Sequence, residues 1–293
     1  MGDNGAVSSG ETEAYTLPRG EQEKERLETQ HSLLVSIAGG LIHESVPKSE
    51  IQRVADIAAG TGIWLFDVAR ELNNPNNRYD GFDISDLQFP SEVPMGLGSI
   101  NFTVHDMTKC FPEEYYGKYD LVNVRFVVQA LKGVLVPTVI SHLMELLRSG
   151  GYLQWHDAQW DDFRAIPPNE DIDYVNGIFI NHMKAYGLSG RLPEQVEYGM
   201  KEIGFEDVVS KWVHTNETEF QPRINLQTRT GALATMPKAL ETLALQEGKP
   251  VDAAAIREKV KEVEGRIDRA NRNGHNWDLA YVVVVGRKPT HDA

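Results

Sequence analysis

Cysteine is almost missing from this sequence, where Cys110 is the single example among 293 residues. One cysteine cannot close a disulfide within the chain, so the disulfide-stapled secreted proteins are excluded and a reducing, cytoplasmic location is expected. Long apolar runs are missing too, so no membrane-spanning helix is predicted. The start of the chain lacks the basic and apolar segments of a secretory signal, and its small and acidic residues predict a disordered tail over 1–14.

Positive charge is scarce as well, because 29 Lys and Arg face 43 Asp and Glu, for a net charge of −14. Nucleic acids and anionic membranes are bound by clustered basic side chains, so neither is expected as a partner. The charge favours a small-molecule partner that is neutral, apolar or cationic. Hydrophobic residues make up 41% of the chain, which is enough for a sizeable core in a monomer or a homodimer.

Apolar and amphipathic segments alternate along the first half of the chain, after a predicted helix over 20–38. Strands are predicted at 53–59, 79–84, 100–105, 119–126 and 152–157, with helices at 63–72 and 134–147. Short strands separated by helices indicate a doubly wound α/β fold with a parallel sheet.

The second half of the chain departs from this alternation. A helix at 194–203, a strand at 205–213 and a closing apolar strand at 277–286 are flanked by two mostly helical insertions, at about 159–192 and 216–275. We therefore predict one catalytic domain over 51–293, with a seven-stranded sheet and inserted helical cap segments. A helical lid over 15–50 precedes it.

The segment that follows the first predicted strand carries the most informative motif. Asp56 ends the strand, and Gly60 and Gly62 turn the chain into the next helix. Glycines let the backbone turn tightly and let a ligand approach it, and ligands of α/β sheets bind at the carboxyl ends of strands. A dinucleotide site would need a third glycine to seat the pyrophosphate, and it is absent. The acidic residue repels phosphate and attracts a cationic amino acid, which favours S-adenosylmethionine over a nicotinamide cofactor.

This motif resembles motif I of class I S-adenosylmethionine-dependent methyltransferases, D/E-x-G-x-G-x-G, at Asp56, Gly60 and Gly62. Ala58 stands where the family has its first glycine, and an alanine is tolerated there if its φ stays negative. The segments that match later family motifs follow in the family's order, so the resemblance covers about residues 50–158.

A closer resemblance, to fungal methyltransferases of secondary metabolism, extends over nearly the whole chain. It rests on Tyr15-x-Leu-x-Arg19, Arg26-Leu27, Gln30-His31, Tyr152-Leu-Gln-Trp155 and the closing Tyr281-Val-Val-Val-Val-Gly-Arg-Lys-Pro289. That group includes enzymes that modify alkaloids, peptides and polyketides, and also a global regulator with the same fold.

The resemblance implies which residues contact the cofactor. These are Tyr15, Arg19, Asp56, Ala58, Gly60, Gly62, Trp64, Asp83, Ile84, Asp106, Met107, Arg125 and Phe126. Asp83 is implied to bind the ribose hydroxyls, and Asp106 the adenine amine, while Met107 packs on the ring. Tyr15 and Arg19 are implied to fold over the cofactor carboxylate. Arg125 has two open interpretations, a contact with that carboxylate or the substrate, and a buried structural ion pair.

The fifth strand ends in His156-Asp157, where the fungal group usually has two acidic residues. An imidazole with a pKa near neutrality can take a proton as a methyl group arrives, so we predict both as catalytic, with His156 as the stronger candidate base. The predicted substrate-binding residues are His31, Trp160, Phe163, Phe179 and His182. Histidines and aromatic residues at helical spacing also fit a core role, and both interpretations stay open.

We therefore predict direct in-line transfer of the S-adenosylmethionine methyl group to a small secondary metabolite, with S-adenosylhomocysteine as the product. Oxygen is slightly preferred over nitrogen as the acceptor. A regulatory protein that binds the cofactor without turning over a small molecule is one alternative, and an enzyme that catalyses a rearrangement without methyl transfer is another. No metal site is predicted, because the histidines lack ligand spacing.

Overall fold

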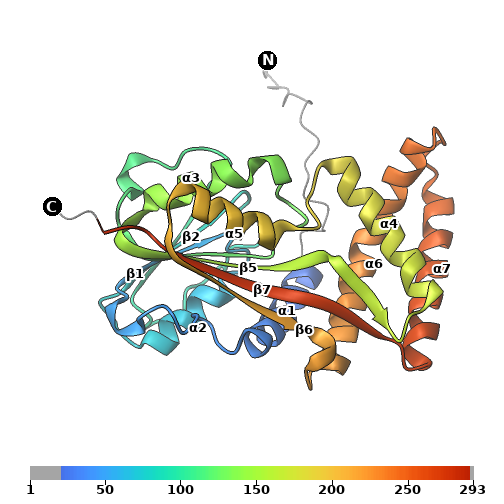
Figure 1. The fold of residues 1–293 in the computed structure, drawn as a ribbon, viewed down its shortest axis with the longest axis horizontal. Helices are drawn as coiled ribbons and strands as arrows, with labels where there is room; N and C mark the ends of the chain where they lie inside the picture. The colour runs from blue at the N-terminus through green and yellow to red at the C-terminus, as the bar shows by residue number, and fades with distance from the viewer. Residues whose placement is uncertain (1–20, 291–293) are drawn as a thin grey trace, which may run out of the picture.

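The computed structural model describes residues 21–290, so the tail expected over 1–14 lies outside the described residues. Its strands are β1 (Arg53–Ile57), β2 (Arg78–Asp83), β3 (Ser99–Val104), β4 (Tyr119–Arg125), β5 (Leu147–Ile166), β6 (Glu206–His214) and β7 (Asn276–Arg287). They form one sheet in the order β3-β2-β1-β4-β5-β7-β6, in which the first five strands run parallel and β7 runs antiparallel to both neighbours (Figure 1). The predicted α/β fold with seven strands is confirmed.

Helices lie on both faces of the sheet and beyond one end of it (Figure 1). They are α1 (Glu21–Ala38), α2 (Ile63–Leu72), α3 (Val136–Leu146), α4 (Glu170–Tyr186), α5 (Leu192–Ile203), α6 (Gln221–Gln246) and α7 (Ala253–Arg272). Helices α3 and α5 pack together on one face, α2 packs on β1 and β2, and α4, α6 and α7 pack on one another. Among the described helices, none has the length and apolar character needed to cross a membrane.

Strand β7 shows why the sheet needs a covering on both faces. Val282 and Val284 pack into the core under α3 and α5, whereas Val283 and Val285 pack into the core with α2. Alternate side chains of a strand point to opposite faces, so an uninterrupted valine run is what a strand buried on both sides requires. This is the physical reason that the closing apolar segment was predictable as a strand.

Strand β5 corrects one prediction. The sequence indicated a strand over 152–157 followed by a helical insertion from about 159, but the strand continues to Ile166. Its second half pairs with β7, with Arg164 opposite Asp278, after a register shift that begins at Gln159. The charged, exposed residues on its outer face concealed the alternation in which Phe163 and Ala165 are buried. The strand also begins earlier than predicted, at Leu147. The predicted boundaries of the other strands and of α1, α2, α3 and α5 lie within two residues of the observed ones.

The extended ends of β5 and β7 carry a helical lobe with a core of its own. Helix α4 begins at an Asn169 side chain that accepts the backbone N–H groups of Asp171 and Ile172. The Asp171 carboxylate pairs with Arg266 and Arg269 of α7, each at 2.8 Å. These contacts tie α4 to α7, and the lobe core also includes side chains of α1 and α6. The lobe therefore holds α6 in a defined position over the sheet end.

Candidate functional site

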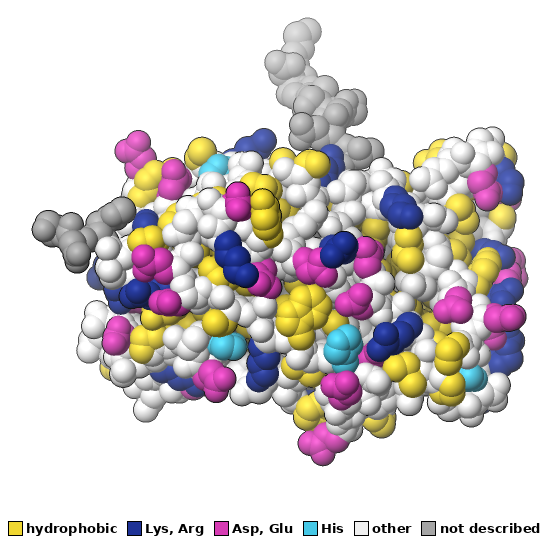
Figure 2. Space-filling model, in the orientation of Figure 1, with side chains coloured by type: hydrophobic (Ala, Val, Ile, Leu, Met, Phe, Trp, Pro, Cys, Tyr) yellow, Lys and Arg dark blue, Asp and Glu magenta, His cyan; other side chains and the backbone are white. Residues whose placement is uncertain are grey.

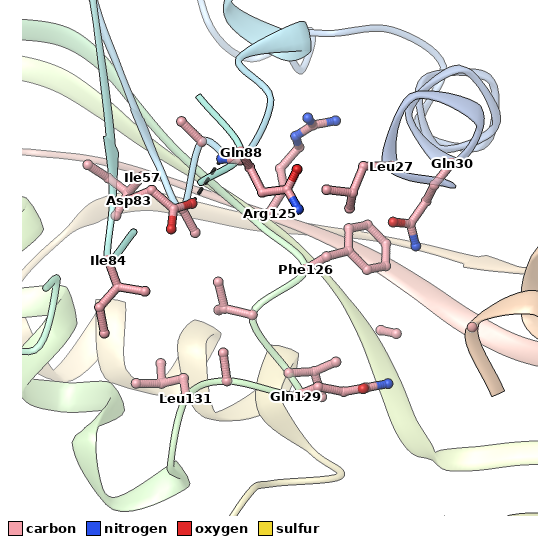
Figure 3. A pocket seen from close by; sticks show the side chains of 18 of the residues that line it. Leu27, Gln30, Ile57, Asp83, Ile84, Gln88, Arg125, Phe126, Gln129 and Leu131 are labelled. Atoms are coloured by element: carbon pink, nitrogen blue, oxygen red, sulfur yellow. Dashed lines mark hydrogen bonds between the residues drawn. The ribbon is translucent and has the colours of Figure 1, made fainter. Parts of the chain in front are cut away.

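A cavity of about 730 Å³ opens at the carboxyl ends of the neighbouring strands β1 and β4. Chain connections leave these two neighbouring strands toward opposite faces, through α2 and α3, and such switch points are where α/β sheets bind ligands. Figure 3 shows the strand-end residues Asp83 and Ile84 across the cavity from Leu27 and Gln30 of α1. The far wall is formed by α6 and by the extended part of β5 and β7.

The turn after β1 has a left-handed backbone at three alternating positions, with φ of 58° at Ala58, 53° at Gly60 and 72° at Gly62. The condition under which an alanine would be tolerated here, a negative φ, is thus not met. An alanine in this region is strained, because its Cβ crowds the following carbonyl oxygen. Gly62 does not line the cavity. A Cβ at this position would lie 2.4 Å from the Phe102 ring, so packing against Phe102 requires a glycine here.

Asp83 connects the end of β2 to this turn. Its carboxylate accepts the backbone N–H of Gly60 at 2.9 Å, which is drawn as the dashed line in Figure 3, and that of Ser85 at 3.3 Å. Asp83 and Ile84 both line the cavity, and the Ile84 side chain is 53% exposed. The cavity therefore has a hydrogen-bond acceptor, the Asp83 carboxylate, next to an apolar surface, the Ile84 side chain.

Asp106 and Met107 lie after β3 and also line the cavity. One carboxylate oxygen of Asp106 accepts both the backbone N–H and the hydroxyl of Thr108, at 2.9 and 2.7 Å. The Met107 carbonyl accepts a hydrogen bond from Nδ1 of His142. Both contacts hold the loop in place, and the pairing of Val104 with Asp83 puts the loop next to Asp83 in the cavity lining.

Asp56 lies beneath the turn, where it is buried and does not line the cavity. Burial raises the pKa of its carboxyl to about 6, although Arg125 and a 2.8 Å hydrogen bond from Asn123 act in the opposite direction. Arg125 lines the cavity and donates to His31 of α1, which lines it too. Trp64 is buried, and the Arg125 guanidinium lies 5.8 Å from its ring centroid.

The two predicted catalytic residues do not line this cavity. His156 is buried with its ring against Phe126, a cavity residue, and burial and the Arg125 charge lower the pKa of His156 to about 3. Asp157 is fully buried, and its carboxylate accepts the backbone N–H groups of Val127 and Ala158 at 2.9 and 3.0 Å. The structure thus places Asp157 under the loop that follows β4, where it fixes the cavity wall.

The predicted substrate residues divide into two sets. His31, Trp160 and Phe179 line the cavity, whereas Phe163 lies behind it, stacked on Trp160 with an interplanar angle of 9°. His182 does not line the cavity, and its Nδ1 lies 3.0 Å from the Thr242 hydroxyl. Burial, with the charge of Lys238, lowers the pKa of His182 to about 4. The predicted contacts Tyr15 and Arg19 lie outside the described residues.

Sequence reasoning missed the amide side chains of this cavity, which are Gln30, Gln88, Gln129 and Gln227. Three of them come from segments to which no contact was assigned, and glutamine has no characteristic spacing that would have revealed them. Within residues 21–290, no group of three or more His, Cys, Asp or Glu is placed to hold a metal ion.

Comparison with known proteins gives a consistent set of relatives, although no family model matches the chain. Methyltransferase grgD of a Penicillium species is 34% identical over 61% of this chain and 64% of its own length. N-methyltransferase verN of Clonostachys rogersoniana is 29% identical over 52% of each chain. The secondary metabolism regulator laeA of Gibberella zeae is 23% identical over 68% of this chain and 63% of its own.

The matches span between about half and two thirds of these relatives' lengths. Their names are those of methyltransferases and of a regulator of secondary metabolism, and the seven-stranded sheet carries the expected motifs at its strand ends in the same order. The chain is thus similar, over about half to two thirds of its length, to fungal methyltransferases and to a fungal regulator of secondary metabolism.

Proposed function

We propose that the chain binds S-adenosylmethionine and transfers its methyl group to a nitrogen of a small, uncharged molecule. The observation that carries the proposal is the convergence of Asp83, Asp106 and Arg125 on one cavity at the switch point of the sheet. The turn at Gly60 offers backbone without a side chain, and the missing third glycine argues against a pyrophosphate. Two acidic residues and one arginine match a ligand that carries hydroxyls, an ammonium and a carboxylate.

The residues of the cavity are assigned along its length. Asp83 would accept the ribose hydroxyls, and Ile84, Asp106 and Met107 would receive the adenine. Arg125 would meet the methionine carboxylate beside the turn. The bound cofactor supplies an electrophilic methyl group on a sulfonium, which a nucleophile attacks in line to leave neutral S-adenosylhomocysteine.

The protein's own contribution to the reaction is position and exclusion of water. Phe126, Trp160 and Phe179 form an apolar wall that can hold a flat molecule against the strand ends. His156, the predicted base, does not line the cavity, so it is not placed to remove a proton from a hydroxyl there. A neutral nitrogen has its lone pair available and loses its proton after methylation. This and the name of the relative verN support nitrogen over the oxygen that the sequence slightly favoured.

A second candidate is a regulatory protein that binds the cofactor, which the similarity to laeA supports. The two are separated by incubating the protein with S-adenosylmethionine whose methyl group is trideuterated, together with neutral aromatic amines or the matching phenols. We expect S-adenosylhomocysteine release that depends on the amine, and a product whose mass carries one trideuteromethyl group. Cofactor binding with no labelled product from either series would favour the regulator, and an isomerised product without label would indicate a rearrangement. A labelled phenol ether would restore oxygen as the acceptor.

A further inference from the structure

Part of the cavity wall belongs to the helical lobe and differs in character from the strand ends. The contributions of α4, α6 and the extended ends of β5 and β7 are Ala158, Trp160, Phe179, Gln227, Thr228, Gly231, Ala232, Leu279 and Tyr281. None of these carries a formal charge at neutral pH, and burial raises the pKa of the Tyr281 phenol above its ordinary value. Among the charged lining residues, Asp83, Asp106 and Arg125 come from the strand ends or from the segments next to them, whereas Arg26 comes from α1.

Gln227 supplies an amide group to this mostly apolar lobe wall. It projects from α6, it is only 7% exposed, and it lines the cavity. Its amide nitrogen is buried and has no hydrogen-bond partner within the described part of the chain. A buried amide without a hydrogen bond destabilises the folded chain, so a ligand that completes this bond is favoured.

Trp160, on β5, is a second cavity residue with a buried donor that lacks a hydrogen-bond partner. Its ring lines the cavity from β5, stacked on Phe163 and edge-on to Phe179, while its indole N–H is buried and lacks a partner among residues 21–290. An indole N–H can only donate, and a glutamine amide can donate and accept. Two buried donors in one apolar wall need an acceptor, such as a carbonyl oxygen.

Gln129 adds a second amide from the loop after β4. Its Oε1 lies 3.2 Å from the hydroxyl of Thr235, which also lies 3.1 Å from the Gly231 carbonyl. Both Thr235 and Gly231 belong to α6, so this contact links the β4 loop to the helix that carries Gln227. The amide of Gln129 is thereby held against α6, and Figure 3 shows Gln129 on the same loop as Leu131, below Phe126.

We infer that Gln227 is a specificity-determining residue that binds an amide or lactam group of an uncharged, largely aromatic substrate. This rests on the proposed function, because it places the substrate in the lobe part of the same cavity. A charged substrate would lose its hydration against a wall with no counter-charge, which is costly. An amide group instead gives its oxygen to the buried donors and its N–H to the glutamine oxygen. In this role the amide is recognised, and another nitrogen accepts the methyl group.

The test uses the whole chain saturated with S-adenosylhomocysteine and two fluorinated probes observed by fluorine NMR. The lactam 6-fluoro-2-quinolinone carries the amide, and 6-fluoro-2-naphthoate has a similar bicyclic shape with a negative charge. The variant is Gln227→Leu, and the matched control is Gln246→Leu, the same change at an exposed position of the same helix. Calorimetric titration with S-adenosylhomocysteine is measured for every variant before the probes are added.

We expect the quinolinone to bind the wild type and the Gln246→Leu control equally, and Gln227→Leu about tenfold more weakly, as for one lost buried hydrogen bond. The naphthoate should bind the wild type at least tenfold more weakly than the quinolinone does. Equal quinolinone affinity in wild type and Gln227→Leu, or tighter binding of the naphthoate, would overturn the role of Gln227. If S-adenosylhomocysteine binds while the quinolinone does not, this inference fails and the proposed function stands. Absence of S-adenosylhomocysteine binding would remove both.

Discussion

The guanidinium of Arg125 donates a hydrogen bond to Nδ1 of His31 over 3.1 Å, which joins the end of β4 to helix α1. Arginine has no acceptor, so Nδ1 must be unprotonated and the imidazole proton sits on Nε2. Nε2 in turn lies 2.9 Å from the Asp67 carboxylate of α2. Burial and the Arg125 charge lower the pKa of His31, so the neutral ring holds one defined tautomer. The sequence left His31 open between a core and a ligand role, and the structure places it in the cavity wall.

Replacing His31 tests this connection. We expect His31→Leu to lower the free energy of unfolding by about 2 kcal/mol, because Arg125 and Asp67 both lose a partner in a partly buried site. Asp67→Asn keeps an acceptor for Nε2 and should cost under about 1 kcal/mol, since the other Asp67 partner is the half-exposed Arg70. Urea unfolding followed by circular dichroism measures both. Equal losses in the two variants would show that the hydrogen bond to Arg125 contributes little.

The left-handed backbone of Ala58 gives a second prediction. Ala58→Gly should raise the free energy of unfolding by about 1 kcal/mol, because glycine adopts this φ without the Cβ clash. The neighbouring Ala59 is the control, since its φ is not positive and it is buried. Ala59→Gly should lower stability by a similar amount, because it only adds freedom to the unfolded chain and removes a buried methyl. A destabilised Ala58→Gly would mean that the methyl group of Ala58 packs better than its backbone suggests.

The buried His156 makes stability depend on pH. Its pKa is about 3 in the folded chain against 6.5 for an exposed histidine, so only the unfolded state binds the proton between these values. Its stabilising contribution is complete above pH 6.5 and is lost as the pH falls, by up to about 1.4 kcal/mol per pH unit. The raised pKa values of Asp56 and Asp157, about 6 and about 7, act with the opposite sign, so stability from these groups falls as the pH rises from 4 to 7.

The contribution of His156 to the pH dependence of stability is measured by comparing the wild type with His156→Gln. Unfolding free energies of the wild type and His156→Gln, measured from pH 7.5 to 5, should diverge in slope, with the wild type losing more stability at low pH. His275→Gln, at a half-buried site near Pro167, is the control and should follow the wild type. Parallel curves for wild type and His156→Gln would contradict a neutral, buried His156.

Helix α6 contains a glycine where a better helix former would stabilise it. A Cβ at Gly231 would meet no atom within 4 Å, and the residue lines the cavity. Gly231→Ala should therefore raise the free energy of unfolding by about 1 kcal/mol. Gly265→Ala, in an equally open position of α7, should do the same.

A large side chain should affect probe binding at Gly231 but not at Gly265. Gly231→Phe fills part of the lobe wall and should weaken binding of 6-fluoro-2-quinolinone, whereas Gly265→Phe leaves the cavity unchanged. Probe affinities by fluorine NMR distinguish them. If both phenylalanine variants bind the probe as the wild type does, Gly231 is not part of the substrate site.

The sheet and the acidic residues at its strand ends were predictable because both follow from short, local sequence patterns. A buried strand such as β1 shows as an apolar run. Asp56, Asp83 and Asp106 lie at or just after the ends of β1, β2 and β3, which the parallel topology brings to one edge of the sheet. The glycines of the turn were also visible, although the strained φ of Ala58 was not, because an alanine in the sequence does not report its dihedral angles.

The lobe wall was not predictable, because it depends on packing between distant segments. Gln227 reaches the cavity only because α6 packs on α1, α4 and the end of β7, contacts that no spacing in the sequence announces. His156 and Asp157 were placed at the right strand, but the direction of each side chain depends on burial. One packs against Phe126 and the other binds the backbone of Val127.

The most direct test of the account is a calorimetric titration with S-adenosylhomocysteine of the wild type, Asp83→Ala and Asp86→Ala. Asp83 lines the cavity, whereas Asp86 is an exposed acid three residues away, and its substitution controls for the lost charge. We predict micromolar binding by the wild type and by Asp86→Ala, and binding at least tenfold weaker for Asp83→Ala, as for a buried hydrogen bond left unmade. No binding by the folded wild type, or equal binding by Asp83→Ala, would contradict the assignment of this cavity to S-adenosylmethionine.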